Sequence, residues 1–240
     1  MARTVGVLGG MGPRATADFF QKLIDLTPAR RDQDHLRVII DNNPGIPDRS
    51  RHILEGGEDP TPALVATARN LERAGADFLV IPCNTAHHFL DAVRRGVRIP
   101  VLDITEVVAQ RAADLERVGL LATRATVVAG LYQRALARKG CEVLTPSEAR
   151  QELVNRAIFA VKAGDLGDRV RSWVREAGQE LLERGAQALV LGCTEIPLVV
   201  DPADWQVPVL DSTALLAEAA VREALGPVAT EPGVVAAFGE

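Results

Sequence analysis

The chain has 240 residues, of which 47% are hydrophobic and 25% charged, and its formal net charge at pH 7 is -5. This length can bury a full core, and the negative charge disfavours nucleic acid as a partner, because phosphates attract basic surfaces. No apolar run approaches the roughly 18 residues that a membrane span needs, and the N-terminal MARTVGVLGG lacks a signal-peptide core, so we expect a cytoplasmic protein without a membrane partner. The three cysteines are too few for a disulfide scaffold and are expected as thiols.

Short apolar runs alternate along the chain with longer amphipathic segments. VGVLGG (5–10), LRVIIDNN (36–43) and DFLVIPC (77–83) are expected strands, and helices are expected at 15–26 and 61–75. Continuous apolar strands that alternate with helices are typical of parallel sheets covered on both faces. The sequence therefore predicts an α/β fold.

The second half of the chain repeats the first half in diverged form. Three segments match in the same order and at nearly one offset: VGVL (5–8) with VGLL (118–121), GADFLVIPC (75–83) with GAQALVLGC (185–193), and PVLDIT (100–105) with PVLDST (208–213). One match between apolar strands could be chance, but three in register indicate internal duplication. We therefore predict two pseudo-symmetric lobes, each a parallel sheet flanked by helices.

The boundaries of the two lobes follow from the last matched pair. PVLDIT and PVLDST are interpreted as the points where the chain crosses from one lobe to the other. Residues 1–105 together with 214–240 are then expected in the first lobe, and residues 106–213 in the second.

Cys83 and Cys193 occupy the same place in the two repeats, each at the end of a buried strand. Ligands of open α/β sheets bind outside the carboxyl ends of the strands. At the start of a following helix, backbone N–H groups and the helix dipole would favour the thiolate. Two facing lobes would present two thiols across one cleft, so that one removes a proton from a carbon acid and the other protonates its opposite face. The alternative is that buried cysteines pack as small hydrophobes, which is what we expect of Cys141.

Polar residues beside the two strand ends could bind a carboxylate. Asn84 and Thr85 follow the first cysteine, and either could instead cap a helix. Thr123 and Thr126 follow the first strand of the second lobe and could act in the same way.

Two cations are candidates for binding an acidic substrate. Arg49 lies on a proline-bounded stretch after the second strand, which we interpret as a loop, and could hold a carboxylate through two hydrogen bonds. Lys162 lies late in an amphipathic helix, where solvation is the ordinary role of a lysine and carboxylate binding is the specific one.

Cofactor and metal sites are weakly indicated. GMGPRA (10–15) fits the dinucleotide pattern G-x-G-x-x-G/A, and Asp41 ends the next strand where a ribose-binding acid would lie. However, Pro13 removes an N–H donor that a pyrophosphate would need, so a tight turn that small substrates can approach is the favoured interpretation. CNTAH (83–87) offers one plausible pair of metal ligands without others nearby. We therefore expect neither a metal nor a cofactor.

Several motifs in combination resemble those of the aspartate racemases of the aspartate/glutamate racemase superfamily. They are GGMGP (9–13), NNP (42–44), IPDR (46–49), PCNTAH (82–87) and GCTEI (192–196), and the resemblance extends from residue 5 to about residue 213. It implies a cofactor-independent racemase with two pseudo-symmetric lobes, often a homodimer, in which Cys83 and Cys193 are the acid/base pair. It places Met11, Arg49, Asn84, Thr85 and Lys162 around the substrate, and we add Thr123, Thr126, Thr194 and Glu195 as candidate substrate-binding residues.

The resulting hypothesis is an isomerase that interconverts the L and D forms of aspartate or a related acidic amino acid. Glutamate racemases are more distant, since they carry Asp-Ser-Gly in place of GGMG and a His where this chain has Glu195. Decarboxylases of substituted malonates use one active cysteine and are disfavoured, whereas maleate isomerases and hydantoin racemases stay open because they can keep two. The alternative of another class is a non-catalytic two-lobe protein that binds a dicarboxylate or a nucleotide, for which both thiols would be dispensable.

Overall fold

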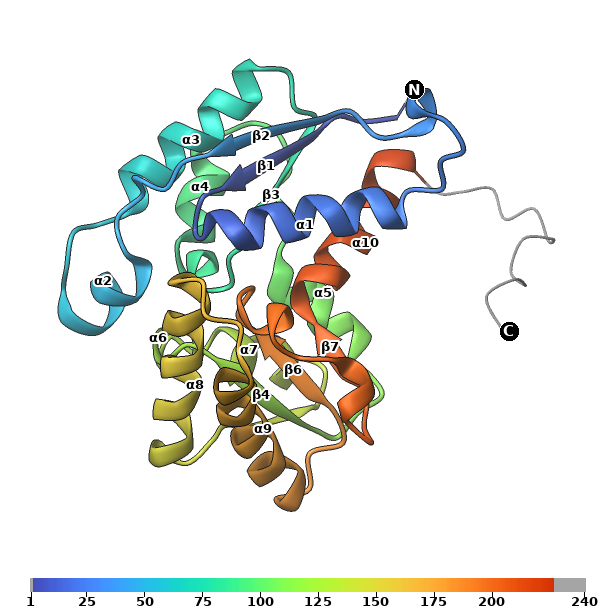
Figure 1. The fold of residues 1–240 in the computed structure, drawn as a ribbon. Coiled ribbons are helices and arrows are strands. Elements are labelled where there is room, and N and C mark those ends of the chain that lie inside the picture. The colour runs from blue at the N-terminus through green and yellow to red at the C-terminus, as the bar shows by residue number, and fades with distance from the viewer. Residues whose placement is uncertain (1, 227–240) are drawn as a thin grey trace.

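The computed structural model describes residues 2–226, which form two parallel β-sheets covered by helices (Figure 1). The strand order is β2-β1-β3 in the first sheet and β5-β4-β6-β7 in the second. The strands are β1 (Val5–Gly9), β2 (Val38–Asn42), β3 (Phe78–Val80), β4 (Arg117–Ala122), β5 (Glu142–Leu144), β6 (Leu189–Gly192) and β7 (Val209–Asp211). The predicted α/β fold with two lobes of parallel sheet is confirmed.

Helices connect the strands within each lobe and at the two crossings. The first lobe contains α1 (Pro13–Leu26), α2 (Arg49–Glu55), α3 (Thr61–Arg73) and α4 (Leu90–Gly96), and the second contains α6 (Arg124–Val128), α7 (Leu131–Ala137), α8 (Glu148–Lys162) and α9 (Asp168–Glu183). The crossings lead into α5 (Ile104–Arg111) and α10 (Ser212–Leu225), and short 3₁₀ helices are η1 (Asp32–Asp34), η2 (Thr85–Phe89), η3 (Ile196–Leu198) and η4 (Pro202–Asp204).

The third strand is shorter than predicted, because β3 ends at Val80 rather than at Cys83. Pro82 has no N–H to donate to a neighbouring strand, and the Cys83 N–H bonds back to the Ile81 carbonyl at 2.7 Å. The chain therefore leaves the sheet before it reaches the cysteine.

The hydrogen bonding of the two sheets reproduces the sequence repeat. β1 pairs in parallel with β2 and β3, and β4 pairs in parallel with β5 and β6. β3 leads to Cys83, and β6 leads to Cys193. Leu79 N donates to Pro100 O at 2.8 Å, and Leu189 N donates to Pro208 O at 3.0 Å. A parallel bridge between Leu79 and Val101 stands in the first sheet where β7 stands in the second.

Each sheet has an apolar core on both of its faces, because β1 and, after its first residue, β4 are buried and alternate side chains point to opposite sides. In the first lobe, Val5 and Val7 pack against α1 and α10, whereas Leu8 packs towards α3 and α4. In the second lobe, Leu120 packs with α5 and α7, whereas Leu121 packs with α8 and α9. Cys83 belongs to the α3–α4 side and Cys193 to the α8–α9 side.

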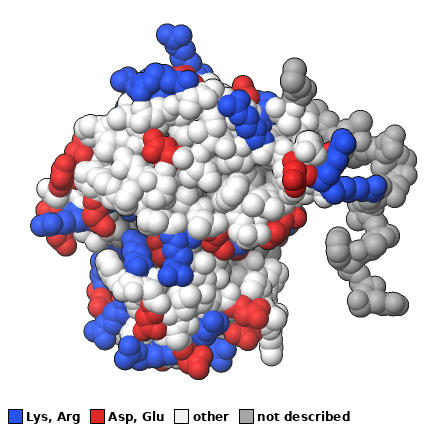
Figure 2. Space-filling model, turned by 45° about the horizontal axis from the view of Figure 1, so that its top comes forward, with Lys and Arg blue, Asp and Glu red and all other residues white. Residues whose placement is uncertain are grey.

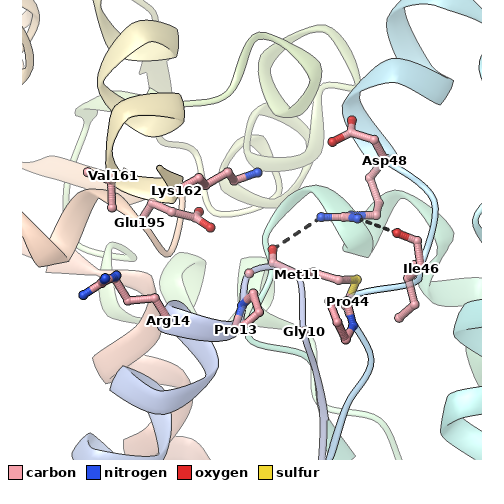
Figure 3. A pocket seen from close by; sticks show the side chains of 12 residues that line it. Gly10, Met11, Pro13, Arg14, Pro44, Ile46, Asp48, Val161, Lys162 and Glu195 are labelled. Carbon is pink, nitrogen blue, oxygen red and sulfur yellow. Dashed lines mark hydrogen bonds between the residues drawn. The ribbon is translucent and has the colours of Figure 1, made fainter. Parts of the chain in front are cut away.

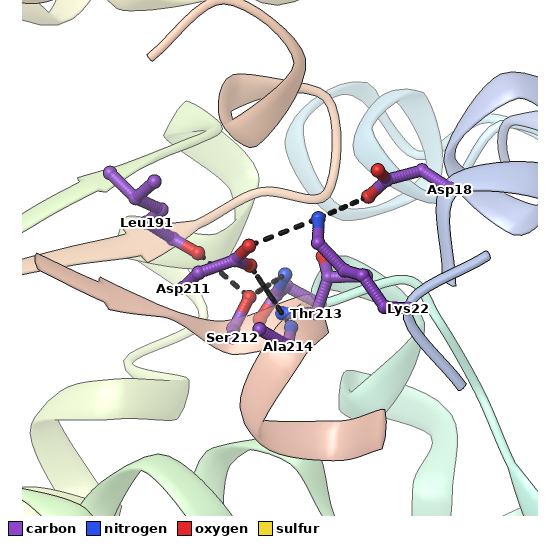
Figure 4. Close-up of polar contacts among 8 residues, drawn as sticks. Asp18, Lys22, Leu191, Asp211, Ser212, Thr213 and Ala214 are labelled. Atoms are coloured by element: carbon purple, nitrogen blue, oxygen red, sulfur yellow. Dashed lines mark hydrogen bonds and ion pairs between the residues drawn. The ribbon is translucent and has the colours of Figure 1, made fainter. Parts of the chain in front are cut away.

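The predicted lobe boundaries fall in the first turns of α5 and α10, the two crossing helices. α10 packs on α1 of the first lobe and on α5. Figure 4 shows how its start is held: the Asp211 carboxylate accepts from Thr213 N at 2.8 Å and from Ala214 N at 3.2 Å, and it pairs with Lys22 of α1 at 3.0 Å. Partial burial is the largest influence on the pKa of Lys22 and acts to lower it, but the charges and hydrogen bonds of Asp211 and Asp18 together outweigh it, so that this pKa is raised. This ion pair ties the first lobe to the end of the second sheet.

The surface carries interspersed charges of both signs. On the face shown in Figure 2, Lys and Arg side chains also gather at the notch between the upper and lower lobes. Of the helices in residues 2–226, none combines the length and the apolar character needed to span a bilayer.

Candidate active site

Cys83 and Cys193 lie just beyond the carboxyl ends of β3 and β6, and each is only 5% exposed. Neither cysteine is followed directly by an α-helix, contrary to the expectation from the sequence. The 3₁₀ helix η2 follows Cys83, and the single 3₁₀ turn η3 follows Cys193. Burial, followed by the charge of Glu195, raises the pKa of Cys193 well above its usual range, and the opposing effect of Lys162 is smaller. Cys193 is therefore held as a thiol.

A cavity of about 880 Å³ opens between the lobes. Its lining is formed by the loop before α1, the stretch from Pro44 to Arg49, and the end of α8 with Glu195 (Figure 3). The lining residues are Gly10, Met11, Gly12, Pro13, Arg14, Pro44, Ile46, Asp48, Arg49, Val161, Lys162 and Glu195. Neither cysteine is among them, but the lining residue Glu195 contacts Cys193, whose Sγ–H donates to Glu195 Oε2 at 3.0 Å.

Arg49 is a buried cation on the first-lobe side of the cavity. It is the first residue of helix α2, where the sequence had suggested a loop, because Asp48 caps that helix by accepting from Arg51 N at 2.7 Å. Its guanidinium donates to the carbonyls of Ile46 at 3.2 Å and Pro47 at 3.1 Å, and more weakly to Met11 at 3.5 Å. Its Nε is buried without a partner. In the described structure this charge is thus held by neutral carbonyls.

Lys162, the last residue of α8, lines the same cavity as Arg49, from the second lobe. Partial burial acts to lower the pKa of Lys162, but the neighbouring Glu195 and then the two cysteines outweigh it, so that this pKa is raised. Lys162 therefore stays protonated within electrostatic range of both Cys83 and Cys193.

Three threonine hydroxyls join the lobes beside the first cysteine. Thr85 Oγ1 lies 3.1 Å from Thr123 Oγ1 and 2.9 Å from Thr126 Oγ1, and the last two are 3.0 Å apart. Thr123 also caps α6 by accepting from Thr126 N. The structure brings these predicted residues together as a polar contact between the lobes. Neither these three threonines nor Thr194, which is 1% exposed, lines the cavity.

The side chain of Asn84 does not play either role expected from the sequence. It makes no cap hydrogen bond with η2. Its Nδ2 donates to Ser212 Oγ at 3.0 Å, its Oδ1 accepts from the Tyr132 hydroxyl at 2.5 Å, and Ser212 Oγ donates to Leu191 O at 2.7 Å. The amide is therefore engaged in a buried network between the lobes.

Sequence reasoning missed Tyr132, Ser212 and His87. One signal was present for Ser212, which replaces Ile104 of the first repeat in the otherwise similar PVLDIT and PVLDST segments. His87 bonds the Cys83 carbonyl through Nδ1 at 2.9 Å, and its Nε2 accepts from Ile104 N at 3.1 Å. Burial is the largest influence on the pKa of His87 and lowers it, so the ring is neutral and carries its proton on Nδ1.

His87 therefore positions the backbone of Cys83, and both ring nitrogens that could bind a metal are used. No group of three or more His, Cys, Asp or Glu side chains in residues 2–226 has the arrangement of a metal site.

The glycine turn after β1 is explained by packing. Gly10 has φ of 94°, and a Cβ built there would lie 2.4 Å from the Asn43 carbonyl carbon. Asp41 accepts from Asn70 Nδ2 at 3.3 Å. The close approach of the Asn43 backbone to Gly10 gives the glycine a role that does not involve a dinucleotide.

Comparisons with known proteins agree on one family. A family model described as Asp/Glu/Hydantoin racemase matches residues 8–220. The broad specificity amino-acid racemase RacX of Bacillus subtilis is 29% identical over 222 residues, covering 90% of this chain and 96% of that protein. The structure of the aspartate racemase of Picrophilus torridus is similar with a TM-score of 0.84 and 33% identity, covering 92% of this chain and 94% of that one. A Francisella tularensis glutamate racemase shares the fold at a TM-score of 0.68 and 20% identity, covering 91% and 79% of the two chains.

Proposed function

Because the chain belongs to the Asp/Glu/Hydantoin racemase family, we propose that it interconverts L- and D-aspartate, or a related acidic amino acid, with Cys83 and Cys193 as the acid/base pair and without a cofactor. Racemase relatives that cover nearly the whole chain make it an isomerase. The choice of substrate and the roles of the two thiols are our proposal.

The observation that carries the substrate proposal is a pair of cations on opposite sides of one cavity. Arg49 and Lys162 line it from opposite lobes, and neither forms an ion pair within residues 2–226. Arg49 is buried, and a buried cation is costly unless an anion compensates it. Lys162 is an exposed cation on the other side, and a cation on each side suits a ligand with two carboxylates.

The thiols supply the proton transfers in this proposal. Cys193 holds its proton in the free enzyme, since its burial and Glu195 oppose the thiolate. In one direction the Cys83 thiolate removes the α proton while the Cys193 thiol protonates the opposite face, and in the reverse direction the roles exchange. The charges of Arg49 and Lys162 stabilise the negative charge that develops at the α carbon and its carboxylate.

A broader amino-acid range is the second candidate. The relative RacX is described as a broad specificity amino-acid racemase. The cavity of about 880 Å³ is also of the size that accommodates drug-sized ligands, and is larger than aspartate requires.

The test is incubation of the purified protein in D₂O with each common amino acid, and with maleate and a hydantoin, followed by chiral chromatography and mass spectrometry. We expect racemisation with α-deuterium uptake for aspartate or glutamate, and its loss in Cys83→Ser and in Cys193→Ser. Turnover of maleate or hydantoin alone, or a lack of turnover with every compound, contradicts the proposal. Full turnover after both thiols are removed contradicts the mechanism.

A further inference from the structure

The Glu195 carboxylate is buried and uses only one of its two oxygens. The side chain is 3% exposed, and its Oε2 accepts from the Cys193 thiol at 3.0 Å. Its Oε1 is buried without a hydrogen-bond partner in the described part of the chain. An unpartnered buried carboxylate oxygen is unfavourable, so one that lines a cavity indicates a donor that arrives with the ligand.

Gly12 lies next to this oxygen. A Cβ at Gly12 would lie 3.3 Å from Oε1, which is a tight contact. Because Gly12 has no side chain, no side chain at position 12 separates Oε1 from the cavity that Gly12 and Glu195 both line. Figure 3 shows the Glu195 carboxylate directed towards the loop of Met11 and Pro13, and so into the cavity.

The charged residues of the cavity indicate the charge of the ligand group that would donate to Glu195 Oε1. A ligand carboxylate cannot bind at Oε1, since two carboxylates repel, and Arg49 and Lys162 are the groups that attract carboxylates. The lining also includes Arg14 and Asp48, both exposed, and beside the buried Glu195 carboxylate Arg49 and Lys162 supply two positive charges. An acidic amino acid carries the complementary set, two carboxylates and one ammonium group.

We infer that Glu195 Oε1 binds the α-ammonium group of the substrate, and that this contact selects free amino acids over dicarboxylates that lack an amino group. The inference rests on the proposed function and deepens it. Since Oε2 of the same carboxylate holds the Cys193 thiol, the contact also brings the α carbon next to that sulfur. The substrate carbon that loses and regains its proton is the one that bears the ammonium group, so one carboxylate aligns the acid and the reacting centre.

The experiment compares aspartate with succinate, which has the same two carboxylates and no amino group. Dissociation constants are measured by calorimetry in a Cys83→Ser background, where turnover is blocked, with and without Glu195→Gln. We expect Glu195→Gln to weaken aspartate binding by about 10- to 100-fold, because a charge-assisted contact is lost. Succinate binding should stay the same or become tighter, since a repelling carboxylate is gone.

Asp48→Asn is the matched control. Asp48 also lines the cavity, but it is exposed, and asparagine preserves its capping of α2. This variant should keep the preference for aspartate over succinate. If Glu195→Gln weakens the binding of both ligands equally, the inference is overturned. It is also overturned if the Cys83→Ser protein binds succinate as tightly as aspartate. The second result does not depend on how the Glu195 variant folds. Racemisation by the unmodified protein is measured in parallel, so that failure of the proposed function is recognised separately.

Discussion

The hydroxyl of Tyr132 is the part of the interlobe network that can be removed most cleanly. Tyr132 is 0% exposed, and its hydroxyl donates to Asn84 Oδ1 at 2.5 Å. Burial raises the pKa of Tyr132, so the hydroxyl keeps its proton and remains a donor. Tyr132→Phe retains the ring, leaves little cavity, and deprives the Asn84 amide oxygen of its partner. Asn84 is 2% exposed, so water does not readily replace the lost donor.

The expected cost follows from that burial. Leaving a buried acceptor unsatisfied costs about 1–3 kcal/mol, and we take about 2 kcal/mol. For a protein of this size, each kcal/mol shifts the Tm by about 2–4 °C, so Tyr132→Phe should lower the Tm by about 4–8 °C. Racemisation should also slow, because Asn84 lies between Cys83 and Thr85 and fixes the backbone of both.

Thermal unfolding followed by circular dichroism, together with urea titration, measures this change. Ser172→Ala is the control, since the Ser172 hydroxyl donates to Arg169 O at 2.8 Å in an exposed position. That variant should change the free energy of unfolding by no more than about 0.5 kcal/mol. If Tyr132→Phe has the same Tm as the unmodified protein, the network does not stabilise the contact between the lobes and the argument is refuted.

Four further predictions concern the site. Cys83→Ser and Cys193→Ser should each reduce racemisation in both directions by about 100-fold or more, as followed by chiral chromatography, and near-full activity in either variant contradicts the two-thiol mechanism. Glu195→Gln should shift the alkylation of Cys193 by iodoacetamide to lower pH, since the charge of Glu195 raises the pKa of that thiol. Mass spectrometry of the labelled peptide measures the extent of alkylation at each pH. An unchanged pH profile contradicts the electrostatic argument. Arg49→Lys should reduce kcat/KM for aspartate by about tenfold or more with the fold intact, because a point charge does not replace the planar guanidinium, and unaltered kinetics would remove Arg49 from the site. The pKa of His87 is lowered in the folded state, so the unfolded state binds the proton more readily and the free energy of unfolding should fall as the pH drops below about 6.5. Urea titrations from pH 8 to 5 should show a shallower fall in His87→Gln than in the unmodified protein. Identical slopes in the two proteins count against a neutral buried His87.

The sequence by itself determined the architecture, because the architecture depends on local patterns. Continuous apolar strands separated by amphipathic segments are sufficient to predict parallel sheets covered on both faces. The repeat predicted that the two sheets are equivalent, and the matching bonds of Leu79 and Leu189 to the two crossing segments are its structural counterpart. The end of β3 was misjudged because the apolar run continues to Cys83, although Pro82 cannot take part in the strand ladder.

Only the tertiary structure decided how the candidate residues are used. Asn84 was singled out from its place after Cys83, but its amide bonds Tyr132 and Ser212, which lie far away in the sequence. The state of Cys193 likewise depends on burial and on the orientation of Glu195 at 3.0 Å, and neither can be read from a cysteine at a strand end. Hydrogen bonds and charges act over a few ångströms in space, so which oxygen of Glu195 is occupied and which faces the cavity becomes defined only when the two lobes come together.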